Sequence, residues 1–272
     1  MIMEVLNSIA NLLKNVREKS PLVHHITNYV TVNDCANITL AIGASPIMAD
    51  DKKEVEQMVS LVSALVINIG TLNERTIESM VLAGKKANER GIPVILDPVG
   101  IGATTLRTDT VRTLINNIKF SVIKGNMSEI KLVAGEKVEI KGVDSAASEE
   151  GAVQIAKDLS KQLNCVIAIT GAKDIITDGD RVLYAQNGHK LLGRVTGTGC
   201  MTASLIGSYC GANKDYLMAT AAAVITMGIA GEKSMESLKD GEGIGSFKVR
   251  LFDNVFNLTT DEIKERGKVR YE

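Results

Sequence analysis

The chain has 272 residues, of which 45% are hydrophobic, and its formal net charge is −1 at pH 7. This length supplies enough apolar material for a large buried core. The balanced charge disfavours nucleic-acid binding, which usually needs a basic face, and the lack of tryptophan with 3% aromatic residues disfavours recognition of bases by stacking. The apolar stretch 219–230 is too short to span a bilayer, so no membrane partner is expected.

Cysteine and histidine usage disfavours a transition-metal site. The four cysteines contain no C-x-x-C pair, which makes zinc binding unexpected. His24, His25 and His189 are the three histidines, and core or capping roles suit them better than metal binding. The N-terminus carries Glu4 and lacks a basic segment followed by an apolar block, so we expect no signal peptide and a cytoplasmic location.

Short runs rich in valine and isoleucine alternate with stretches of helical periodicity. Such runs are typical of strands that are buried on both faces, and Gly91 is placed to end the helix before it. Strand and helix in repetition predict an α/β fold with a central, mostly parallel sheet flanked by helices. The expected strands are 64–69, 92–96, 120–123 and 165–169, and the helices between them include 74–90 and 148–163.

The later part of the chain has a different pattern. Residues 178–180, Asp-Gly-Asp, predict a hairpin turn that joins 175–176 to 182–184 and gives the sheet an antiparallel edge. Residues 199–258 are expected to be mostly helical. Because no low-complexity linker or repeat divides the sequence, we predict a single domain over residues 1–272.

Polar residues follow the expected strands, where ligands bind in an open parallel sheet. Asp97 directly follows a strand and suits Mg²⁺, held directly or through water, although a turn or capping role before Pro98 is equally open. Asn126 and Glu129 could hold a hydrated cation near phosphates or form a helix capping pair. Lys124 ends a strand, where an unpaired ammonium is costly, so we expect it at the mouth of the site facing an anion; a solvated surface lysine is the alternative.

Residues 197–200, Gly-Thr-Gly-Cys, precede an apolar helix. A glycine-rich turn into a helix leaves N–H groups that can bind a phosphoryl group, so Gly197 and Gly199 predict an anion hole; close packing of the helix on the sheet explains them equally well. The chain lacks the P-loop pattern G-x-x-x-x-G-K-[ST]. It fails the dinucleotide fingerprint as well, because Thr202 stands at the third glycine position.

Taken together, these segments resemble the hydroxyethylthiazole kinase family of the ribokinase-like superfamily. The resemblance implies a ribokinase-like domain without a separate lid. The matching stretches are SPLVHHITN (20–28), GASPIM (43–48), NIGTL (68–72), VILDPVGIGAT (94–104), IKGNMSEI (123–130), AITG (168–171), NGHKLL (187–192), VTGTGC (195–200) and GSF (245–247).

The resemblance implies that ATP, with Mg²⁺, phosphorylates the hydroxyl of 4-methyl-5-(2-hydroxyethyl)thiazole in thiamine biosynthesis or salvage. It also implies a homotrimer with active sites between subunits. The site residues that we carry over or infer are Met48, Asn28, Gly70 and Gly197 for the thiazole, Lys124, Thr170, Asn126 and Gly199 for ATP, Asp97 and Glu129 for the metal, and Cys200 for catalysis.

Two of these positions have features of their own. Many members of the family carry arginine where this chain has Lys124, and a lysine cannot make the bidentate phosphate contact of a guanidinium. Cys200 stands where most ribokinase-like kinases carry an aspartate base, and cysteine is common there in this family. We expect the helix N-terminus to lower its pKa toward neutrality, so that the thiolate accepts the substrate proton.

Three other functions fit parts of the pattern. A nicotinamide-dependent oxidoreductase would explain the glycine turns, but the chain lacks the fingerprint and an acidic ribose ligand after an early strand. A nucleotide-binding sensor would not need Cys200 or the paired acids. A pyrimidine-alcohol kinase of the same pathway is the nearest alternative, and Met48 with the preceding Gly-Ala-Ser-Pro favours the thiazole.

Overall fold

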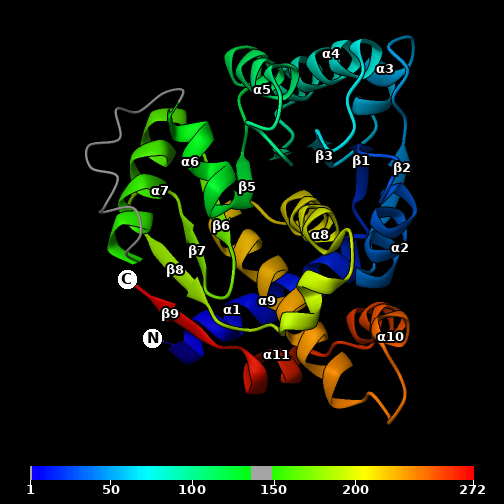
Figure 1. Cartoon of the computed structure of the whole chain (residues 1–272), viewed down its shortest axis with the longest axis vertical. Helices are drawn as coiled ribbons and strands as arrows, with labels where there is room; N and C mark the ends of the chain where they lie inside the picture. The colour runs from blue at the N-terminus through cyan, green and yellow to red at the C-terminus, as the bar shows by residue number, and fades with distance from the viewer. Residues whose placement is uncertain (1, 136–148) are drawn as a thin grey trace.

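A nine-stranded sheet runs through the molecule, whose computed structural model describes residues 2–135 and 149–272 (Figure 1). Its strands are β1 Leu22–Ile26, β2 Ser45–Met48, β3 Ala64–Asn68, β4 Val94–Asp97, β5 Val122–Asn126, β6 Val166–Thr170, β7 Asp174–Thr177, β8 Val182–Ala185 and β9 Val269–Tyr271. They lie in the order β2-β1-β3-β4-β5-β6-β7-β8-β9.

The six strands from β2 to β6 pair in parallel, and β7, β8 and β9 add an antiparallel edge. Both the mostly parallel sheet and the hairpin at 178–180 are therefore confirmed; Thr177 pairs with Val182 across that turn. Parallel pairing brings the carboxyl ends of six strands to one edge of the sheet, so the residues that follow them meet there.

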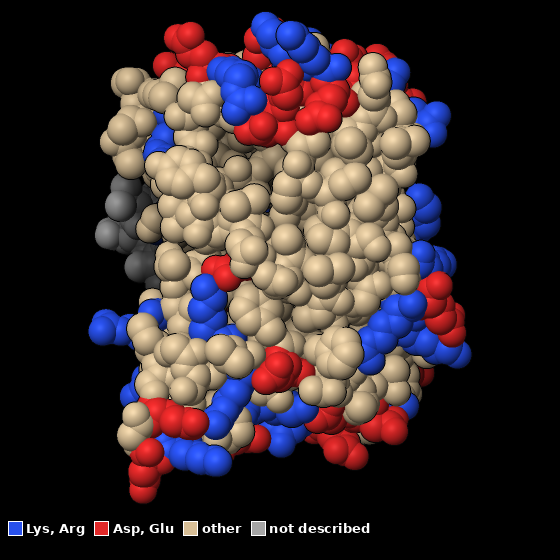
Figure 2. Space-filling model, turned by 90° about the vertical axis from the view of Figure 1, so that its right-hand side faces the viewer, with Lys and Arg blue, Asp and Glu red and all other residues tan. Residues whose placement is uncertain are grey.

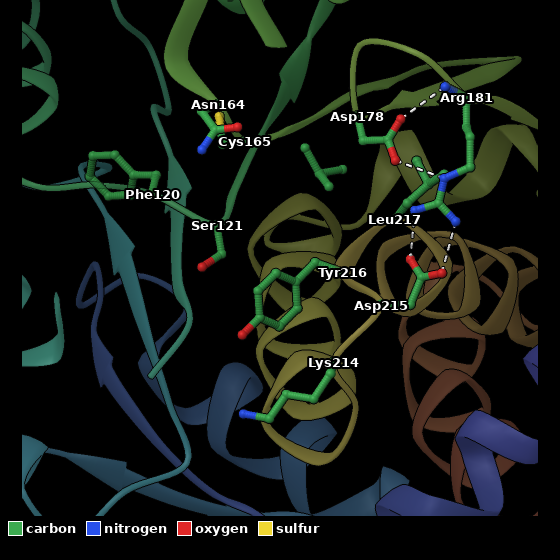
Figure 3. Close-up of a pocket in the computed structure, with 11 residues that line it drawn as sticks. Phe120, Ser121, Asn164, Cys165, Asp178, Arg181, Lys214, Asp215, Tyr216 and Leu217 are labelled. Atoms are coloured by element: carbon green, nitrogen blue, oxygen red, sulfur yellow. Dashed lines mark hydrogen bonds and ion pairs between the residues drawn. The ribbon is translucent and has the colours of Figure 1, made fainter. Parts of the chain in front are cut away.

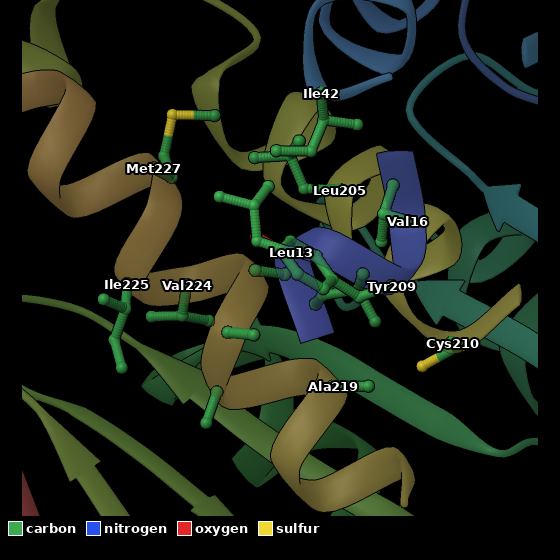
Figure 4. Packing of buried hydrophobic residues seen from close by; sticks show 14 of the residues in the cluster. Leu13, Val16, Ile42, Leu205, Tyr209, Cys210, Ala219, Val224, Ile225 and Met227 are labelled. Carbon is green, nitrogen blue, oxygen red and sulfur yellow. The ribbon is translucent and has the colours of Figure 1, made fainter. Parts of the chain in front are cut away.

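One face of the sheet is covered by α1 Ile2–Lys19, α2 Val32–Ile42, α8 Thr198–Ala212, α9 Tyr216–Glu236, α10 Ile244–Phe256 and α11 Thr260–Arg266. The helix α8 is buried nearly all round, and a Cβ on its Gly207 would lie 2.5 Å from Val66 on β3. Leu13 of α1 and Tyr209 of α8 belong to the same packed cluster (Figure 4). The expected helical C-terminal third is confirmed, and α8 is held tightly against the strands that carry the site.

The other face is covered by α3 Val55–Val59, α4 Glu74–Arg90, α5 Thr105–Asn117, α6 Met127–Gly135 and α7 Glu149–Leu163. The helix predicted over 74–90 is confirmed; it begins at an Asn73–Thr76 capping box and ends at Gly91, whose φ is +65°. The helix predicted over 148–163 is confirmed from Glu149 onward, and Ser148 lies outside the described residues. No helix within the described ranges is long and apolar enough to cross a membrane.

Every expected strand differs from the structure at one end or both, and the two largest differences concern β4 and β5. Asp97, which was expected to follow its strand, is the last residue of β4. The expected strand 92–96 begins only at Val94, because Pro93 has no N–H to donate to the sheet. The expected strand 120–123 runs instead from Val122 to Asn126, since β6 continues to pair with it through Lys124 and Ala168. Lys124 therefore lies inside a strand and does not end one.

Strand β1 contains two consecutive histidines, and both are buried. His24 Nε2 donates to the Ala49 carbonyl at 2.7 Å, and His25 Nδ1 donates to the Val23 carbonyl at 3.1 Å. The second ring nitrogen of each, His24 Nδ1 and His25 Nε2, is buried without a hydrogen-bond partner among residues 2–135 and 149–272. Burial, with a smaller effect of His24, lowers the pKa of His25 to about 3, so its imidazole is neutral in the folded protein.

The neutral imidazole of His25 predicts a pH-dependent stability. Below pH 6.5 the unfolded chain binds a proton that the folded chain excludes, so stability should fall as the pH falls. The free energy of unfolding of the natural chain, minus that of His25→Gln, should decrease by about 1.4 kcal/mol between pH 7.5 and 5.5. Urea titrations at both pH values measure this difference, which cancels titrations common to both proteins. An identical pH dependence in both would contradict the prediction.

Candidate active site

The carboxyl-end edge of the sheet carries a cluster of buried polar side chains. The register of β3 and β4 sets Asn68 directly opposite Asp97, and both side chains are almost fully buried. Asn28 lies shortly after the end of β1, which is the strand next to β3. Cys200 lies in the first turn of α8. Four elements that are distant in sequence thus bring these groups together, as expected for the edge of an open parallel sheet.

Two asparagine amides connect the cluster. Asn28 Nδ2 donates to Asn68 Oδ1 at 2.9 Å and to Cys200 Sγ at 3.3 Å. Asn68 Nδ2 donates to Asp97 Oδ2 at 2.6 Å and also to Cys200 Sγ at 3.3 Å. The sulfur therefore receives two N–H donors, and the predicted substrate residue Asn28 and the predicted catalytic residue Cys200 are in direct contact.

Lys124 and Asp97 form a buried ion pair. Lys124 Nζ lies 3.3 Å from Asp97 Oδ1, and the two residues are 4% and 0% exposed. Burial opposes the charged ammonium, but the negative charges of Asp97 and Glu129 raise the pKa of Lys124 above its ordinary value, so it stays charged. Lys124 therefore faces an anion as expected, but that anion is the Asp97 carboxylate and the ammonium is buried instead of lying at the mouth. The alternative of a solvated surface lysine is wrong, because burial demands the partner that Asp97 supplies.

Glycine occupies the two positions of the turn into α8 for different structural reasons. Gly197 has φ +88°, and a Cβ there would lie 2.6 Å from Thr31 Cγ2, so both its backbone and its surroundings require glycine. At Gly199 a Cβ would lie 3.1 Å from Lys124 Nζ. The ammonium therefore lies against the N-terminal turn of α8, and the two positive groups converge where an anion would bind.

The environment of Cys200 raises its pKa, contrary to our expectation. Burial is the largest cause, and the negative charge of Asp97 acts in the same direction. Hydrogen bonds from Thr31 and Asn28 and the charge of Lys124 oppose this rise without reversing it. The predicted shift toward neutrality is wrong because it considered the helix N-terminus and left out the carboxylate, and at neutral pH the thiol is protonated.

Glu129 and Asn126 form the reciprocal capping pair that was one of their two predicted roles. Asn126 N donates to Glu129 Oε2 at 2.8 Å, and Glu129 N donates to Asn126 Oδ1 at 2.9 Å. Glu129 Oε1 also accepts the Gly100 N–H at 3.0 Å. The capping pair joins the start of α6 to the loop that follows β4.

The carboxylates suit a hydrated magnesium ion better than a bare one. Each oxygen of Asp97 and Glu129 already accepts a hydrogen bond or ion pair from the protein, which leaves one further lone pair for a water. Within residues 2–135 and 149–272, no three His, Cys, Asp or Glu side chains cluster to chelate a metal. Mg²⁺ usually keeps several waters and binds through one or two carboxylates, so the residues fit it in that form.

A cleft of ≈ 570 Å³ opens beside this cluster. Its polar side includes Thr170 at the end of β6 and Asp174 at the start of β7, and α9 contributes Val224 and Met227 as an apolar wall. Gly199 of the turn into α8 also lines it. Burial raises the pKa of Asp174 to about 7. The size and the mixed lining are those of a small-molecule cleft that joins the candidate phosphate site.

The two remaining predicted substrate residues, Gly70 and Met48, do not line this cleft. Gly70 follows β3, where a Cβ would lie 2.9 Å from the side chains of Asn28 and Asn68, so only glycine fits. Met48 ends the edge strand β2, opposite His25 of β1, and is 37% exposed. Gly70 is thus part of the cluster, whereas Met48 stands one strand further out at its border.

Sequence reasoning did not identify Asn68 or Arg107. Asn68 had a signal, because it is a polar residue in the otherwise apolar run 64–69. Arg107 of α5 had none: its guanidinium donates to the carbonyls of Ile69, Gly70 and Val99, each at 2.7 Å. It thereby holds together the loops that follow β3 and β4, a role visible only in the folded chain.

A second cavity, of ≈ 310 Å³, lies at the opposite edge of the sheet, where β5 and β6 begin (Figure 3). Arg181 lines it, but its guanidinium is bound to Asp215 at 2.9 and 3.1 Å and to Asp178 at 2.7 Å. None of the predicted site residues lines this cavity. We therefore place the candidate active site at the carboxyl-end edge.

Comparison with known proteins gives a consistent answer. Residues 13–261 match the Hydroxyethylthiazole kinase family. The chain is 59% identical over 268 residues to a hydroxyethylthiazole kinase of Alkaliphilus oremlandii, covering 98% of this chain and 99% of that one. It is 54% identical over 272 residues to one of Clostridium tetani, with coverages of 98% and 99%.

Solved structures agree on the fold. A hydroxyethylthiazole kinase protein from Pyrococcus horikoshii OT3 superposes with a TM-score of 0.89 at 43% identity, over 97% of this chain and 99% of that one. A ribokinase-like superfamily protein from Enterococcus faecalis V583 has a TM-score of 0.63 at 12% identity over 93% of both chains, which shows the fold alone. The fold is therefore ribokinase-like, and the chain belongs to the hydroxyethylthiazole kinase family.

Proposed function

We propose that the chain transfers the γ-phosphoryl group of ATP to the hydroxyl of 4-methyl-5-(2-hydroxyethyl)thiazole, in thiamine biosynthesis or salvage. The observation that carries this proposal is the convergence of the Lys124 ammonium and the N-terminus of α8 beside Cys200. Family membership supports the thiazole alcohol as acceptor and favours a kinase over an oxidoreductase or a sensor. We further propose that residues 1–272 act as one catalytic domain.

Phosphoryl transfer needs positive charge around the moving group more than it needs covalent help. In this proposal ATP occupies the ≈ 570 Å³ cleft, with Thr170 and Asn126 near its phosphates and Val224 and Met227 against its apolar part. The N–H groups around Gly199 and the free N–H groups of Lys124 then bind the transferring phosphoryl group. Asp97 and Glu129 would hold a hydrated Mg²⁺, which neutralises phosphate charge when bound.

The thiazole alcohol lies on the other side of Cys200 in this proposal. Asn28, Gly70 and Gly197 border its pocket, and Met48 contributes apolar contact at the outer end. The hydroxyl arrives at Cys200 Sγ, whose two amide donors hold the sulfur in place. A loose transition state makes little demand on proton transfer before the new O–P bond forms. The hydroxyl proton can therefore leave late, to a phosphate oxygen when Cys200 is a thiol and to Cys200 Sγ in the fraction that is a thiolate.

An assay of substrate scope tests the proposed function. Purified protein with ATP and Mg²⁺ should release ADP in step with thiazole phosphate, and much more slowly with the pyrimidine alcohol. Lys124→Met should reduce kcat/KM for ATP by about 10²-fold or more, because it removes charge at the phosphoryl group. Lys214→Met, in the cavity at the opposite edge, is the matched control and should behave as the natural chain. Faster turnover of the pyrimidine would reassign the substrate.

The raised pKa of Cys200 predicts how Cys200→Ser behaves with pH. At pH 7 both side chains are protonated, so kcat should fall by only about tenfold or less. As the pH rises toward the raised pKa of Cys200, a thiolate begins to form in the natural chain alone, and the gap between the two kcat values should widen. The measurement is kcat at saturating ATP and thiazole across pH 6.5–9.5. Parallel profiles would show that Cys200 never accepts the proton.

We also propose that the protein is a homotrimer in which the partner chain completes the thiazole pocket. A broad face with few charged side chains supports this, on the side of the molecule where β2, α2 and α10 lie (Figures 1 and 2). Leu40, Val249 and Phe256 are 54%, 62% and 66% exposed there, around a groove of ≈ 460 Å³. An exposed apolar patch of this kind is typical of a protein–protein interface. Met48 ends β2, the strand at that edge of the sheet, so a partner chain bound to this face would lie close to it.

A charge placed in this face should separate the subunits. Phe256→Glu should shift the mass in light scattering from three chains of 29.1 kDa to one, and activity should fall with it. Leu106→Glu is the control, since Leu106 is an exposed apolar residue on α5, in the other helix layer. A fully active monomer of the natural chain would rule out the shared site.

A further inference from the structure

Asn68 has a completely satisfied amide at the centre of the site. It is 1% exposed and makes four hydrogen bonds. Its Nδ2 donates to Asp97 Oδ2 and Cys200 Sγ, and its Oδ1 accepts from Asn28 Nδ2 and from Gly70 N, the last at 2.8 Å. All of its four partners have proposed roles in metal, substrate or proton handling.

We propose that Asn68 is a positioning residue for phosphoryl transfer, which sets Cys200 Sγ and the Asp97 carboxylate at fixed places relative to each other. This inference rests on the proposed kinase function for its kinetic consequence. One amide group contacts the acid beside the phosphates and the sulfur beside the acceptor hydroxyl. Its two N–H bonds diverge at the planar angle of an amide, so neither partner moves independently of the other.

The chemistry of the site explains why the residue is an asparagine. Its neighbours present two acceptors, a carboxylate and a sulfur, and two donors, an amide and a backbone N–H. Only a carboxamide offers two donors and two lone pairs at matching positions. Aspartate would keep the acceptors and lose both donors, whereas leucine would fill the same space and lose all four bonds.

The geometry also assigns Asn68 a role that Lys124 cannot supply. Lys124 contacts Asp97 through the other oxygen, Oδ1, and reaches toward Gly199 of α8. A carboxylate held at one oxygen can turn about its Cβ–Cγ bond, whereas one held at both oxygens cannot. Asn68 thus orients the Asp97 carboxylate while it donates to Cys200, and misplacement of about 1 Å in such a site costs about 10²-fold in rate.

A purely structural role for Asn68 makes a different prediction, because loss of any buried hydrogen-bonded asparagine destabilises a protein. The chain offers a matched control in Asn213, which is 6% exposed and ends α8 at its opposite terminus. Asn213 accepts from Asn15 Nδ2 at 2.7 Å and donates to the Tyr209 carbonyl at 2.9 Å. Asn213→Leu removes one buried and one partly buried hydrogen bond without touching the site.

The first test is kinetic. Asn68→Leu should lower kcat by about 10²-fold and change KM for ATP and thiazole by less than about threefold. Asn213→Leu should leave kcat unchanged at a similar loss of thermal stability. In the Cys200→Ala background, Asn68→Leu should cost only about tenfold, because the sulfur is absent and the Asp97 carboxylate alone loses its positioning. Additive losses, or equal kcat in both leucine variants, would overturn the proposal.

The second test needs no turnover, so it separates failure of this inference from failure of the proposed function. Loss of one N–H donor makes the thiolate of Cys200 less stable, and iodoacetamide should alkylate Cys200 about tenfold more slowly at pH 8.5 in Asn68→Leu. Cys35, Cys165 and Cys210 are internal controls in the same mass spectra. Unchanged alkylation of Cys200 would overturn the inference, even if the natural chain did not phosphorylate the thiazole.

Asn68→Asp keeps the test decisive if the leucine variant does not fold. It preserves the shape of the side chain and both acceptor contacts, to Asn28 and Gly70, whereas it removes the two donors and adds a carboxyl group beside Asp97. The same loss of kcat and of Cys200 alkylation is expected. Natural values of both in Asn68→Asp would show that the donors do not matter.

Discussion

The buried ion pair between Lys124 and Asp97 is the interaction on which the rest of the site depends. A charge in the core of a sheet is tolerated only with an opposite charge and hydrogen bonds that use its remaining positions. Asn68 uses the second oxygen of Asp97, and the parallel register of β3 with β4 sets that amide opposite the carboxylate. The ammonium keeps N–H groups beyond the one that meets Asp97, and Gly199 leaves the space in which they lie.

The pair also explains how a lysine can serve at position 124, where the resemblance implied that an arginine is common. An arginine fork would contact two phosphate oxygens at once, but its planar head is larger than an ammonium. The Lys124 ammonium lies within 3.1 Å of the position that a Cβ on Gly199 would occupy. A compact point charge fits between the Asp97 carboxylate and the first turn of α8, and the helix N–H groups supply the directed hydrogen bonds that lysine lacks.

The sequence predicted the fold well where local pattern decides it. Apolar runs marked the central strands, and Asn73 and Gly91 bound the helix predicted over 74–90. The strand ends were less certain, because partners from other parts of the chain extend β5 through Lys124. Site residues were found by their place after strands and by family resemblance. Their protonation was not, since the pKa of Cys200 depends on burial and on Asp97, which only the folded chain brings near it.

The same neighbourhood gives a physical reason for cysteine at position 200. An aspartate there would place a second carboxylate near Asp97, and only Lys124 would be available to neutralise both. Like charges in a buried site raise each other's pKa, and they would also repel the incoming phosphates. A protonated thiol keeps the Lys124–Asp97 pair electrically balanced before ATP binds. A cysteine is a weaker proton acceptor than an aspartate, but a loose transition state needs little proton transfer. In return, the site repels the negative charge of the phosphates less.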